Sequence, residues 1–405
     1  MKSLLSHLFL FVFVLFLPSQ LSRHFWPAAS FISGIPIDYL SPTLYLTDFI
    51  AFIFIILFLP QINKFIKNIP LQSWLFGGIF IFVNCLFSLS PAFTFYKWIR
   101  VGFYFLTGLS LWFAVPKFSK TITLGLAGSV IWVSILAWAQ FLQGGSLGSL
   151  WTYLGERPLS TSMPLVAKVN TNFGVFLRPY ATFPHPNALA GYLLVSCLLI
   201  YFYLIKKNNF QLSTFNFQLL LKTGLYIGIF TILITFSPPS IFLEAAFIIT
   251  IIIKKLRLPY VISLLLIILL SFGLFWNLRL SSVSERVYLF KKSLSAISTH
   301  PLTGVGLGNF PLYSYPLNHF PLQLSWQPVH NLFLLLLSEL GIPSAFIIFY
   351  LIFKYCLKIK KINIVFLYSV ICILFTGMFD HYWLTSHQNI MLLLLAPAMV
   401  KFPPE

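Results

Sequence analysis

The chain has 405 residues, of which 59% are hydrophobic and only 8% are charged. Because a soluble domain carries about 25% charged residues, this composition excludes a soluble protein and predicts one embedded in a membrane. The formal net charge of +18 is mostly lysine in short connections between apolar segments, so it reflects membrane topology and predicts no nucleic-acid partner.

Apolar runs recur along the whole chain, each close to the ~20 residues that a helix needs to span a bilayer. The runs are continuous rather than alternating, so they predict an all-α, polytopic transmembrane helical bundle and exclude a β-barrel. We expect a single integral membrane domain over residues 1–405, whose first run also resembles the hydrophobic region of a signal peptide. The expected spans, about twelve, are residues 4–18, 42–60, 71–89, 95–115, 120–142, 187–205, 219–236, 239–253, 259–276, 329–353, 362–380 and 386–401.

Lysine and arginine divide between the two predicted faces of the membrane. With both termini inside, fifteen of the nineteen lysines face the cytoplasm, as the positive-inside rule requires. Arg257 is also inside, but the other six arginines face outward: Arg23, Arg100, Arg157, Arg178, Arg279 and Arg286. Arginine kept outside against this bias predicts a phosphate-bearing ligand, because the guanidinium group binds phosphate oxygens two at a time. This orientation requires the chain to turn at Pro238-Pro239. If residues 219–253 formed one kinked span, every later segment would face the opposite side of the membrane.

Two connections are far longer than the others and face outward, at residues 143–186 and 277–328. Long connections of this kind usually carry function. Near the end of the first loop, Arg178 and His185 are candidate substrate ligands, because both lie close to the membrane surface beside a stiff, proline-rich turn. Asn187 has two interpretations, a helix cap or a substrate ligand.

The second loop begins with a short amphipathic helix near 284–299. Arg286 lies in its first turn, where free backbone N–H groups also favour an anion. A glycine run follows at 304–310; no strand precedes it, so it is no dinucleotide fingerprint, and it allows close backbone approach to a ligand or to another helix. The loop ends at His330-Asn331, where the histidine is either a functional group or an interfacial polar residue.

Four acidic residues lie within the predicted spans, and intramembrane ionisable groups are candidates for function. Three of them, Asp48, Glu244 and Asp380, are in spans that reach the outer face, and the favoured interpretation is that each pairs with an outer arginine. The fourth, Glu339, lies roughly two and a half turns below His330. In the first outer loop, Arg157 and Lys168 either line a route for the ligand or are solvated charges, and solvation is the favoured interpretation.

Several short motifs follow one another between about residues 170 and 350. They are Arg178, Phe183-Pro184-His185-Pro186-Asn187-Ala188-Leu189-Ala190, Arg286, His300-Pro301-Leu302-Thr303-Gly304-Val305-Gly306-Leu307-Gly308-Asn309-Phe310, His330-Asn331 and Glu339-Leu340-Gly341. In this order and spacing they resemble the O-antigen ligase and O-antigen polymerase family. The resemblance implies a glycosyltransferase of the bacterial inner membrane with its site facing outward. Its donor would be a glycan on undecaprenyl pyrophosphate, and its acceptor lipid A core, another glycan or another hydroxyl group, with ligase and polymerase both open.

By this resemblance, Arg286 would bind the pyrophosphate and His330 would act near the acceptor hydroxyl or the leaving group. The other candidate substrate ligands are Arg178, Arg100, His185, Asn187, Gly306, Asn309 and Asn331. The family often carries a Ser-Arg or Thr-Arg pair at the outer turn that corresponds to residues 236–240, and here proline stands at the arginine position. Either Arg178 or Arg100 replaces that arginine, or the substrate differs, or activity is reduced.

The chemistry is consistent with a transferase on independent grounds. A donor outside the membrane must arrive already activated, and arginines stabilise a departing pyrophosphate without a metal. The outer acids Asp38, Glu156 and Glu285 form no paired cluster in sequence, so we expect no metal and no cofactor. A histidine suits removal of a proton from an acceptor hydroxyl, and in-line displacement predicts inversion at the anomeric carbon. The alternatives are a transporter or flippase for an anionic lipid or solute, although no repeated halves are evident, and a catalytically silent relative.

Overall fold

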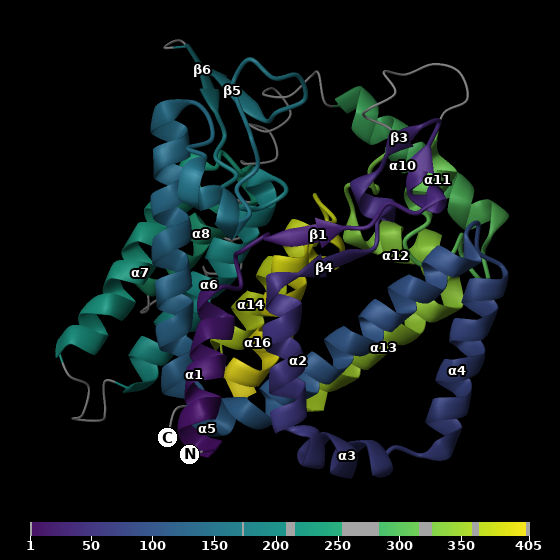
Figure 1. The fold of residues 1–405 in the computed structure, drawn as a ribbon, viewed down its shortest axis with the longest axis horizontal. Helices are drawn as coiled ribbons and strands as arrows, with labels where there is room; N and C mark the ends of the chain where they lie inside the picture. Colours follow the sequence, from purple (N-terminus) through teal and green to yellow (C-terminus); the bar gives the residue numbers. More distant parts are fainter. Residues whose placement is uncertain are drawn as a thin grey trace.

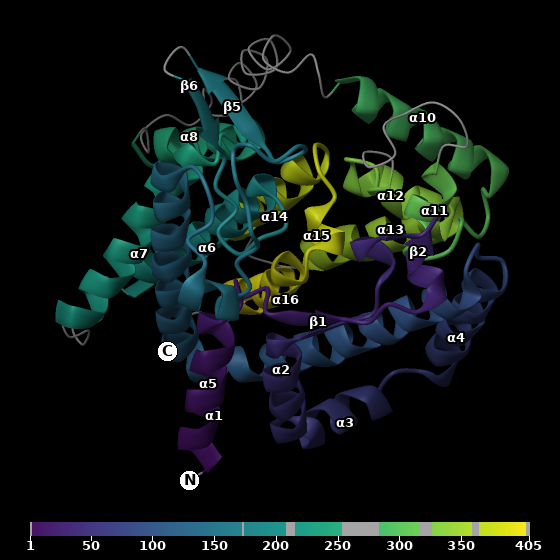
Figure 2. The same ribbon diagram turned by 45° about the horizontal axis from the view of Figure 1, so that its top comes forward.

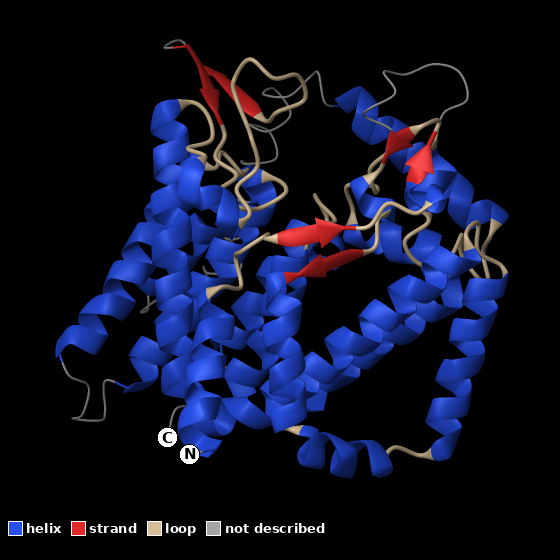
Figure 3. Ribbon diagram, in the orientation of Figure 1, coloured by secondary structure: helices blue, strands red, loops and turns tan. Residues whose placement is uncertain are grey.

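The structure is a computed structural model that describes residues 2–171, 174–207, 215–252, 283–315, 326–358 and 364–401. Helices make up most of this part of the chain, and its strands form three two-stranded sheets (Figures 1 and 3). The expected helical bundle is therefore present, and short strands that were not expected are added to it.

Helix α1 (Lys2–Leu15) packs along α5, and an extended stretch follows it at residues 16–45, here called the N-terminal outer segment. The sequence did not single this segment out as a long connection. It contains β1 (Ser22–His24), η1 (Ala28–Ser30), β2 (Phe31–Ile32), β3 (Ile35–Pro36), η2 (Asp38–Leu40) and β4 (Thr43–Tyr45). Strand β1 pairs antiparallel with β4, and β2 with β3, so the segment folds back on itself (Figure 1).

The next helices bend sharply. Helices α2 (Leu46–Leu57) and α3 (Leu59–Lys67) meet at an angle of 70°, so the predicted span 42–60 is interrupted near its end. Helix α4 (Leu71–Leu86) leads to α5 (Pro91–Gln143), whose 53 residues form two helical halves that meet between the two spans expected at 95–115 and 120–142. Its two halves meet at a kink at Phe118, shortly after Pro116, because proline removes a backbone donor and crowds the preceding turn.

The first long outer loop holds η3 (Ser149–Leu154) and a hairpin of β5 (Lys168–Thr171) and β6 (Gly174–Leu177). It ends where α6 (Pro186–Lys207) begins. Helices α7 (Phe215–Ile234) and α8 (Pro238–Ile252) are separate, as the expected turn requires. Proline suits the first position of α8 because the N–H that it lacks would have no partner there.

The second half of the chain begins with α10 (Val283–Thr299), which matches the helix expected near 284–299. The remaining helices are α11 (Phe310–Ser314), α12 (Leu332–Leu340), α13 (Ile342–Lys358), α14 (Ile364–Gly377), α15 (Tyr382–Thr385) and α16 (His387–Lys401). The prediction of one helix over 329–353 is wrong, because the chain breaks at Gly341, whose φ of +77° no helix interior adopts.

Three described helices are long and apolar enough to cross a membrane by length and composition, namely α5, α6 and α7, and the bent pair α2–α3 makes a fourth. The expected number of about twelve is not confirmed, since α1, α4, α8, α13 and α14 are apolar but shorter. The expected span 259–276, together with Arg257 and Arg279, lies outside the described residues.

The elements divide between the two ends of the bundle. The start of α1 and the end of α16 lie at one end, the β2–β3 and β5–β6 sheets and α10 lie at the other, and the β1–β4 sheet lies between them (Figures 1 and 2). The two long loops therefore gather on the same side as the N-terminal outer segment. That this side faces away from the cytoplasm stays a prediction.

Small residues bring the central helices close together. A Cβ added at Gly224 of α7 would lie 3.1 Å from the Ala127 carbonyl of α5, and one at Gly125 of α5 would lie 3.0 Å from the Phe11 carbonyl of α1. In lipid, such close packing supplies much of the association between helices. Helix α6 is the most enclosed of the long helices, with 83% of its apolar window buried, so the residues at its start are held in a fixed place.

Candidate active site around His330 and Asp380

His330 stands directly before α12, and the next residue fixes its position. The Asn331 side chain caps α12 by accepting from the backbone N–H groups of Phe333 and Leu334, each at 3.0 Å. Its amide nitrogen donates to the Met378 carbonyl at 3.0 Å, which ties this turn to the end of α14. Both ends of the Asn331 amide are thus used within the fold, where they position His330.

The His330 ring faces a buried carboxylate. Its Nδ1 lies 3.5 Å from Oδ1 of Asp380, an ion-pair distance that is longer than a strong hydrogen bond. Asp380 also accepts from the amide of Asn187 at 2.9 Å and from the backbone N–H of His381 at 2.8 Å. The carboxylate is therefore held in place by two donors beside the His330 ring.

Asn187 connects this carboxylate to Arg178. Its side-chain oxygen accepts from the Arg178 guanidinium at 2.7 Å, while its amide nitrogen donates to Asp380. Arg178 also donates through Nε to the Thr235 carbonyl at 2.8 Å, at the turn between α7 and α8. Where a direct arginine partner was expected for Asp380, the structure puts asparagine and histidine against it, and Arg178 acts through Asn187.

The start of α6 explains why Asn187 is available for this contact. The backbone N–H of Asn187 donates to Nδ1 of His185 at 3.2 Å, and those of Ala188 and Leu189 donate to the His185 carbonyl. His185 therefore caps the helix. The interpretation of Asn187 as the cap is wrong, because Asn187 already lies inside the first turn of α6.

His381 completes the cluster. Its ring centroid lies 5.3 Å from that of His330, and its Nδ1 lies 2.8 Å from the Thr385 hydroxyl. Tyr39, from η2 of the N-terminal outer segment, meets the His381 ring edge-on at 5.8 Å. Burial lowers the pKa of His381 to about 4, although the charge of Asp380 opposes this shift, so the ring is neutral near pH 7.

Arg286 reaches the same turn from α10. Its guanidinium donates to the Phe379 carbonyl at 3.3 Å, one residue before Asp380. The neighbouring Glu285 accepts from the amide of Gln327, and burial raises the pKa of this carboxyl group. The two residues to which the sequence resemblance gave the chemistry, His330 and Arg286, therefore both contact residues 379–380.

The same cluster offers the donor set of a metal site. One nitrogen from each of His330 and His381 and one carboxylate oxygen of Asp380 lie within 4.8 Å of one another. Two histidines and a carboxylate suit zinc and other first-row ions. The expectation of no metal considered only the acids of the outer loops and left Asp380 out.

Arg100 belongs to a second cluster. It donates to Asp48 at 2.7 Å and to the Tyr104 hydroxyl at 2.9 Å. His387 contacts the Thr47 hydroxyl at 2.6 Å and approaches the Arg100 guanidinium at 3.3 Å. Arg100 is thus engaged within the fold, with Asp48 as its ion-pair partner.

The glycine run packs against helices. A Cβ on Gly306 would lie 2.2 Å from Cβ of Ser88, between α4 and α5. Asn309 is fully buried and donates to the Thr94 hydroxyl at 2.5 Å. Of the two expectations for this run, the contacts of Gly306 and Asn309 support close approach to another helix.

Asn84 of α4, which the sequence did not single out, holds this region together. Its amide nitrogen donates to the carbonyls of Thr303 at 2.8 Å and Glu339 at 3.1 Å. Its oxygen accepts from the Trp98 indole at 2.9 Å and from the backbone of Leu307 at 3.2 Å. The carboxylate of Glu339 accepts from the backbone of Phe310, so this acid supports the fold below His330.

Glu244 of α8 differs from the other intramembrane acids. It is buried, and neither of its carboxylate oxygens has a hydrogen-bond partner among the described residues. The arginine partner that was expected for it is not found in that part of the chain.

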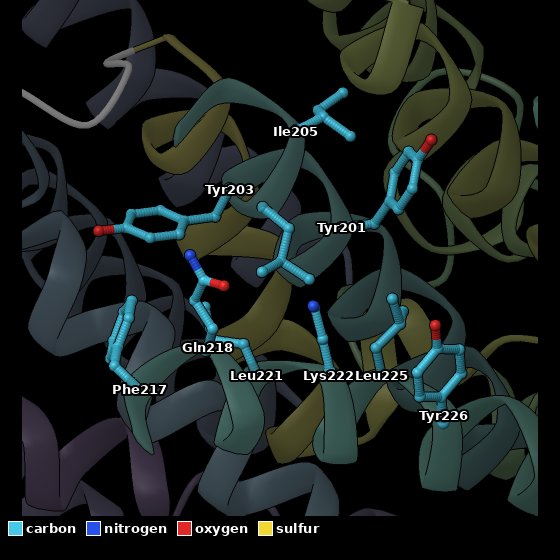
Figure 4. Close-up of a pocket in the computed structure, with 10 residues that line it drawn as sticks. Tyr201, Tyr203, Ile205, Phe217, Gln218, Leu221, Lys222, Leu225 and Tyr226 are labelled. Atoms are coloured by element: carbon cyan, nitrogen blue, oxygen red, sulfur yellow. The ribbon is translucent and has the colours of Figure 1, made fainter. Parts of the chain in front are cut away.

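A pocket of about 230 Å³ lies elsewhere, between the end of α6 and the start of α7 (Figure 4). Its polar lining comes from Tyr201, Tyr203, Gln218, Lys222 and Tyr226. None of the His330 cluster lines it, so it is not the site described above.

Sequence reasoning missed three contributors to the site region, Tyr39, Asn84 and His381. Only His381 carried a signal, since it directly follows an intramembrane aspartate. Tyr39 and Asn84 are one tyrosine and one asparagine in ordinary surroundings, and their roles arise only from contacts between distant segments.

Comparison with known proteins bears on the region that carries most of these groups. Residues 187–350 match the family model described as O-antigen ligase. This stretch, less than half of the chain, is similar to that family. Searches of the curated proteins and of the solved structures each found no match. The resemblance drawn from the motifs is thereby confirmed, and in general terms it indicates a membrane glycosyltransferase of the O-antigen ligase type.

The ligase-family region supplies Asn187, Arg286 and His330, while Asp380 and His381 follow it in the chain. The N-terminal outer segment and the first outer loop precede it. The site is thus built from the ligase-family region together with segments on either side of it.

Proposed function

We propose that this protein transfers a glycan from undecaprenyl pyrophosphate to a hydroxyl acceptor at the outer face of the bacterial cytoplasmic membrane. The observation that carries the proposal is the His330–Asp380 pair, 3.5 Å apart, at a turn that Arg286 also contacts. A histidine oriented by a fixed carboxylate is suited to accept a proton. The acceptor is lipid A core in a ligase, or another carrier-linked glycan in a polymerase.

In the proposed reaction, Nδ1 of His330 faces Asp380, so Nε2 takes the proton of the acceptor hydroxyl. The acceptor oxygen bonds to the anomeric carbon as the bond from that carbon to the pyrophosphate oxygen breaks. The electron pair of the broken bond leaves with undecaprenyl pyrophosphate, and Arg286 stabilises the charge that develops there. Attack opposite the leaving group inverts the anomeric configuration, and no metal takes part.

Arg178 is our proposed replacement for the arginine that the family often carries at the turn after α7. Its Nε–H donates to the Thr235 carbonyl at this turn, at 2.8 Å. Arg100, the other candidate, is held by Asp48 in the second cluster. The contacts therefore favour Arg178.

The test is release of undecaprenyl pyrophosphate by the purified chain in nanodiscs, supplied with carrier-linked glycan and acceptor. His330→Ala and Arg286→Ala should each lower the rate by at least about 100-fold. Two matched controls, His7→Ala and the exposed Arg23→Ala, should keep the rate within about threefold of wild type.

EDTA should leave the wild-type rate unchanged. Loss of activity in EDTA, with recovery on addition of zinc or manganese, would contradict the metal-free reaction and place an ion among His330, Asp380 and His381. Movement of the lipid-linked glycan across the bilayer without turnover, unaffected by His330→Ala, would instead support the transporter alternative.

A further inference from the structure

A pocket of about 600 Å³ opens between the N-terminal outer segment and the first outer loop. His24 and Asp38 line it from the segment, and Arg157 lines it from the loop. The apolar part of its lining includes Leu159, Met163 and Val166. Its volume lies within the range of about 300–1,000 Å³ that is usual for small-molecule sites. All of its lining residues precede the ligase-family region.

The pocket adjoins the His330 cluster through two consecutive residues of η2. Asp38 lines the pocket, and the next residue, Tyr39, packs edge-on against His381 at 5.8 Å. Burial raises the pKa of the Tyr39 phenol. The charge of Asp380 in the cluster and that of Asp38 in the pocket raise it further, whereas Arg157 in the pocket lowers it. Two consecutive residues of η2 thus contact the pocket and the cluster.

The polar groups of the pocket are both held and accessible. Arg157 lies 3.6 Å from the Asp38 carboxylate, yet their side chains stay 38% and 53% exposed. When the Gln20 amide is oriented so that its nitrogen donates a hydrogen bond and its oxygen accepts one, the oxygen accepts from the Arg157 guanidinium at 2.7 Å. The ring of His24 is fixed through Nδ1, 2.5 Å from the Ser41 hydroxyl, and it stacks on Trp26. Its Nε2 makes no hydrogen bond with the described part of the chain and can serve a ligand.

This combination matches the chemistry of a sugar. A carboxylate accepts from hydroxyl groups, a guanidinium donates to them, and a neutral imidazole can do either. Burial lowers the pKa of His24, which favours the neutral ring. Leucine, methionine and valine side chains cover the C–H faces of a sugar ring. A pocket built to hydrogen-bond hydroxyl groups selects strongly against ligands that lack them.

We propose that this pocket is a subsite for the acceptor glycan, and that Asp38 and Arg157 are specificity-determining residues within it. The assignment to the acceptor rests on the proposed function. The pocket is lined by the two outer segments and not by the apolar helices, so it suits the glycan part of a substrate and not its lipid chains. Arg286, the proposed pyrophosphate ligand, comes from α10, which contributes nothing to the lining.

The test separates binding from turnover. Saturation-transfer NMR on the full chain in nanodiscs would use two probes, the delipidated core oligosaccharide of lipopolysaccharide and the carrier-free repeat oligosaccharide. The variants are Asp38→Asn and Arg157→Gln, which remove one charge each from exposed positions. Lys168→Gln is the matched control, because Lys168 lies in the same loop outside the pocket lining.

We expect at least one probe to bind the wild type, Lys168→Gln and His330→Ala equally, and to bind Asp38→Asn and Arg157→Gln at least 10-fold more weakly. In turnover assays the two pocket variants should raise KM for the acceptor by a similar factor, with kcat and the donor KM within about threefold of wild type.

Equal binding of both probes by the pocket variants and the wild type would overturn the proposal, as would absence of binding to the wild type. A rise in the donor KM instead of the acceptor KM would overturn the acceptor assignment. Probe binding that Asp38→Asn abolishes, in a chain that turns over no donor, would support the sugar site while contradicting the proposed function.

Discussion

The side-chain amide of Asn187 donates to Oδ2 of Asp380 at 2.9 Å and so joins the start of α6 to the turn after α14. The same side chain accepts from Arg178 at 2.7 Å. One asparagine thereby connects the first outer loop to the carboxylate that faces His330. The geometry of the proposed base thus depends on residues that lie some two hundred positions apart.

Asn187→Ala should lower kcat by about 10-fold or more, because a buried carboxylate that loses a donor costs about 1–3 kcal/mol. The donor KM should change by less than about threefold, since Asn187 acts through Asp380. Steady-state kinetics in nanodiscs check this. Asn170→Ala, at an exposed position of β5, is the control. If Asn187→Ala kept the wild-type kcat, Asn187 would not be a residue that positions the site.

Arg178→Ala should lower turnover by at least about 10-fold, because it takes away both the donor to Asn187 and the cation at the turn after α7. The double variant Arg178→Ala with Pro238→Arg returns an arginine to that turn, at the first position of α8. It should recover part of the lost rate. A double variant no more active than Arg178→Ala would contradict the idea that Arg178 stands in for the family's arginine.

Acidification should destabilise the site through His381. Its pKa is lowered from 6.5 to about 4 in the folded protein, so the unfolded chain binds the proton first as the pH falls. Stability is therefore lost as the pH drops below about 6.5, by roughly 2 kcal/mol at pH 5.

Thermal unfolding in detergent at pH 7 and pH 5 measures this effect. His381→Asn should show a smaller decrease in Tm between the two pH values than the wild type, although its Tm at pH 7 falls because the contact with Thr385 is lost. An equal pH dependence in wild type and variant would show that His381 is not the group that opposes folding in acid.

Gly341→Ala should destabilise the break between α12 and α13. Its φ is +77°, and an added Cβ would lie 2.4 Å from the Leu302 carbonyl. Gly34→Ala is a matched control, because its φ of +79° is similar but nothing lies within 4 Å of the added atom. Both lose about 1 kcal/mol from the backbone conformation, and Gly341→Ala should lose more because backbone atoms must also move. Equal losses of stability in the two variants would mean that the backbone around Leu302 moves away from the added Cβ without a cost in free energy.

The sequence by itself determined the membrane class, the helical bundle, the helix near 284–299 and the resemblance to the O-antigen ligase family. These features follow from composition, from apolar periodicity and from motifs in a fixed order, all of which are local in the chain. The sequence failed where a span is interrupted, as at Gly341, because the run on either side stays apolar while contacts with Leu302 decide the break.

Only the tertiary structure decided which polar groups meet. Asp380 was visible as an intramembrane acid, but its partners His330 and Asn187 come from other helices, and Tyr39 reaches His381 from a segment that carried no motif. Arg100 and Arg178 were equal candidates in sequence, and the structure holds the first against Asp48 and the second at the site. Such pairings depend on how helices pack, and residue spacing does not encode packing between segments hundreds of positions apart.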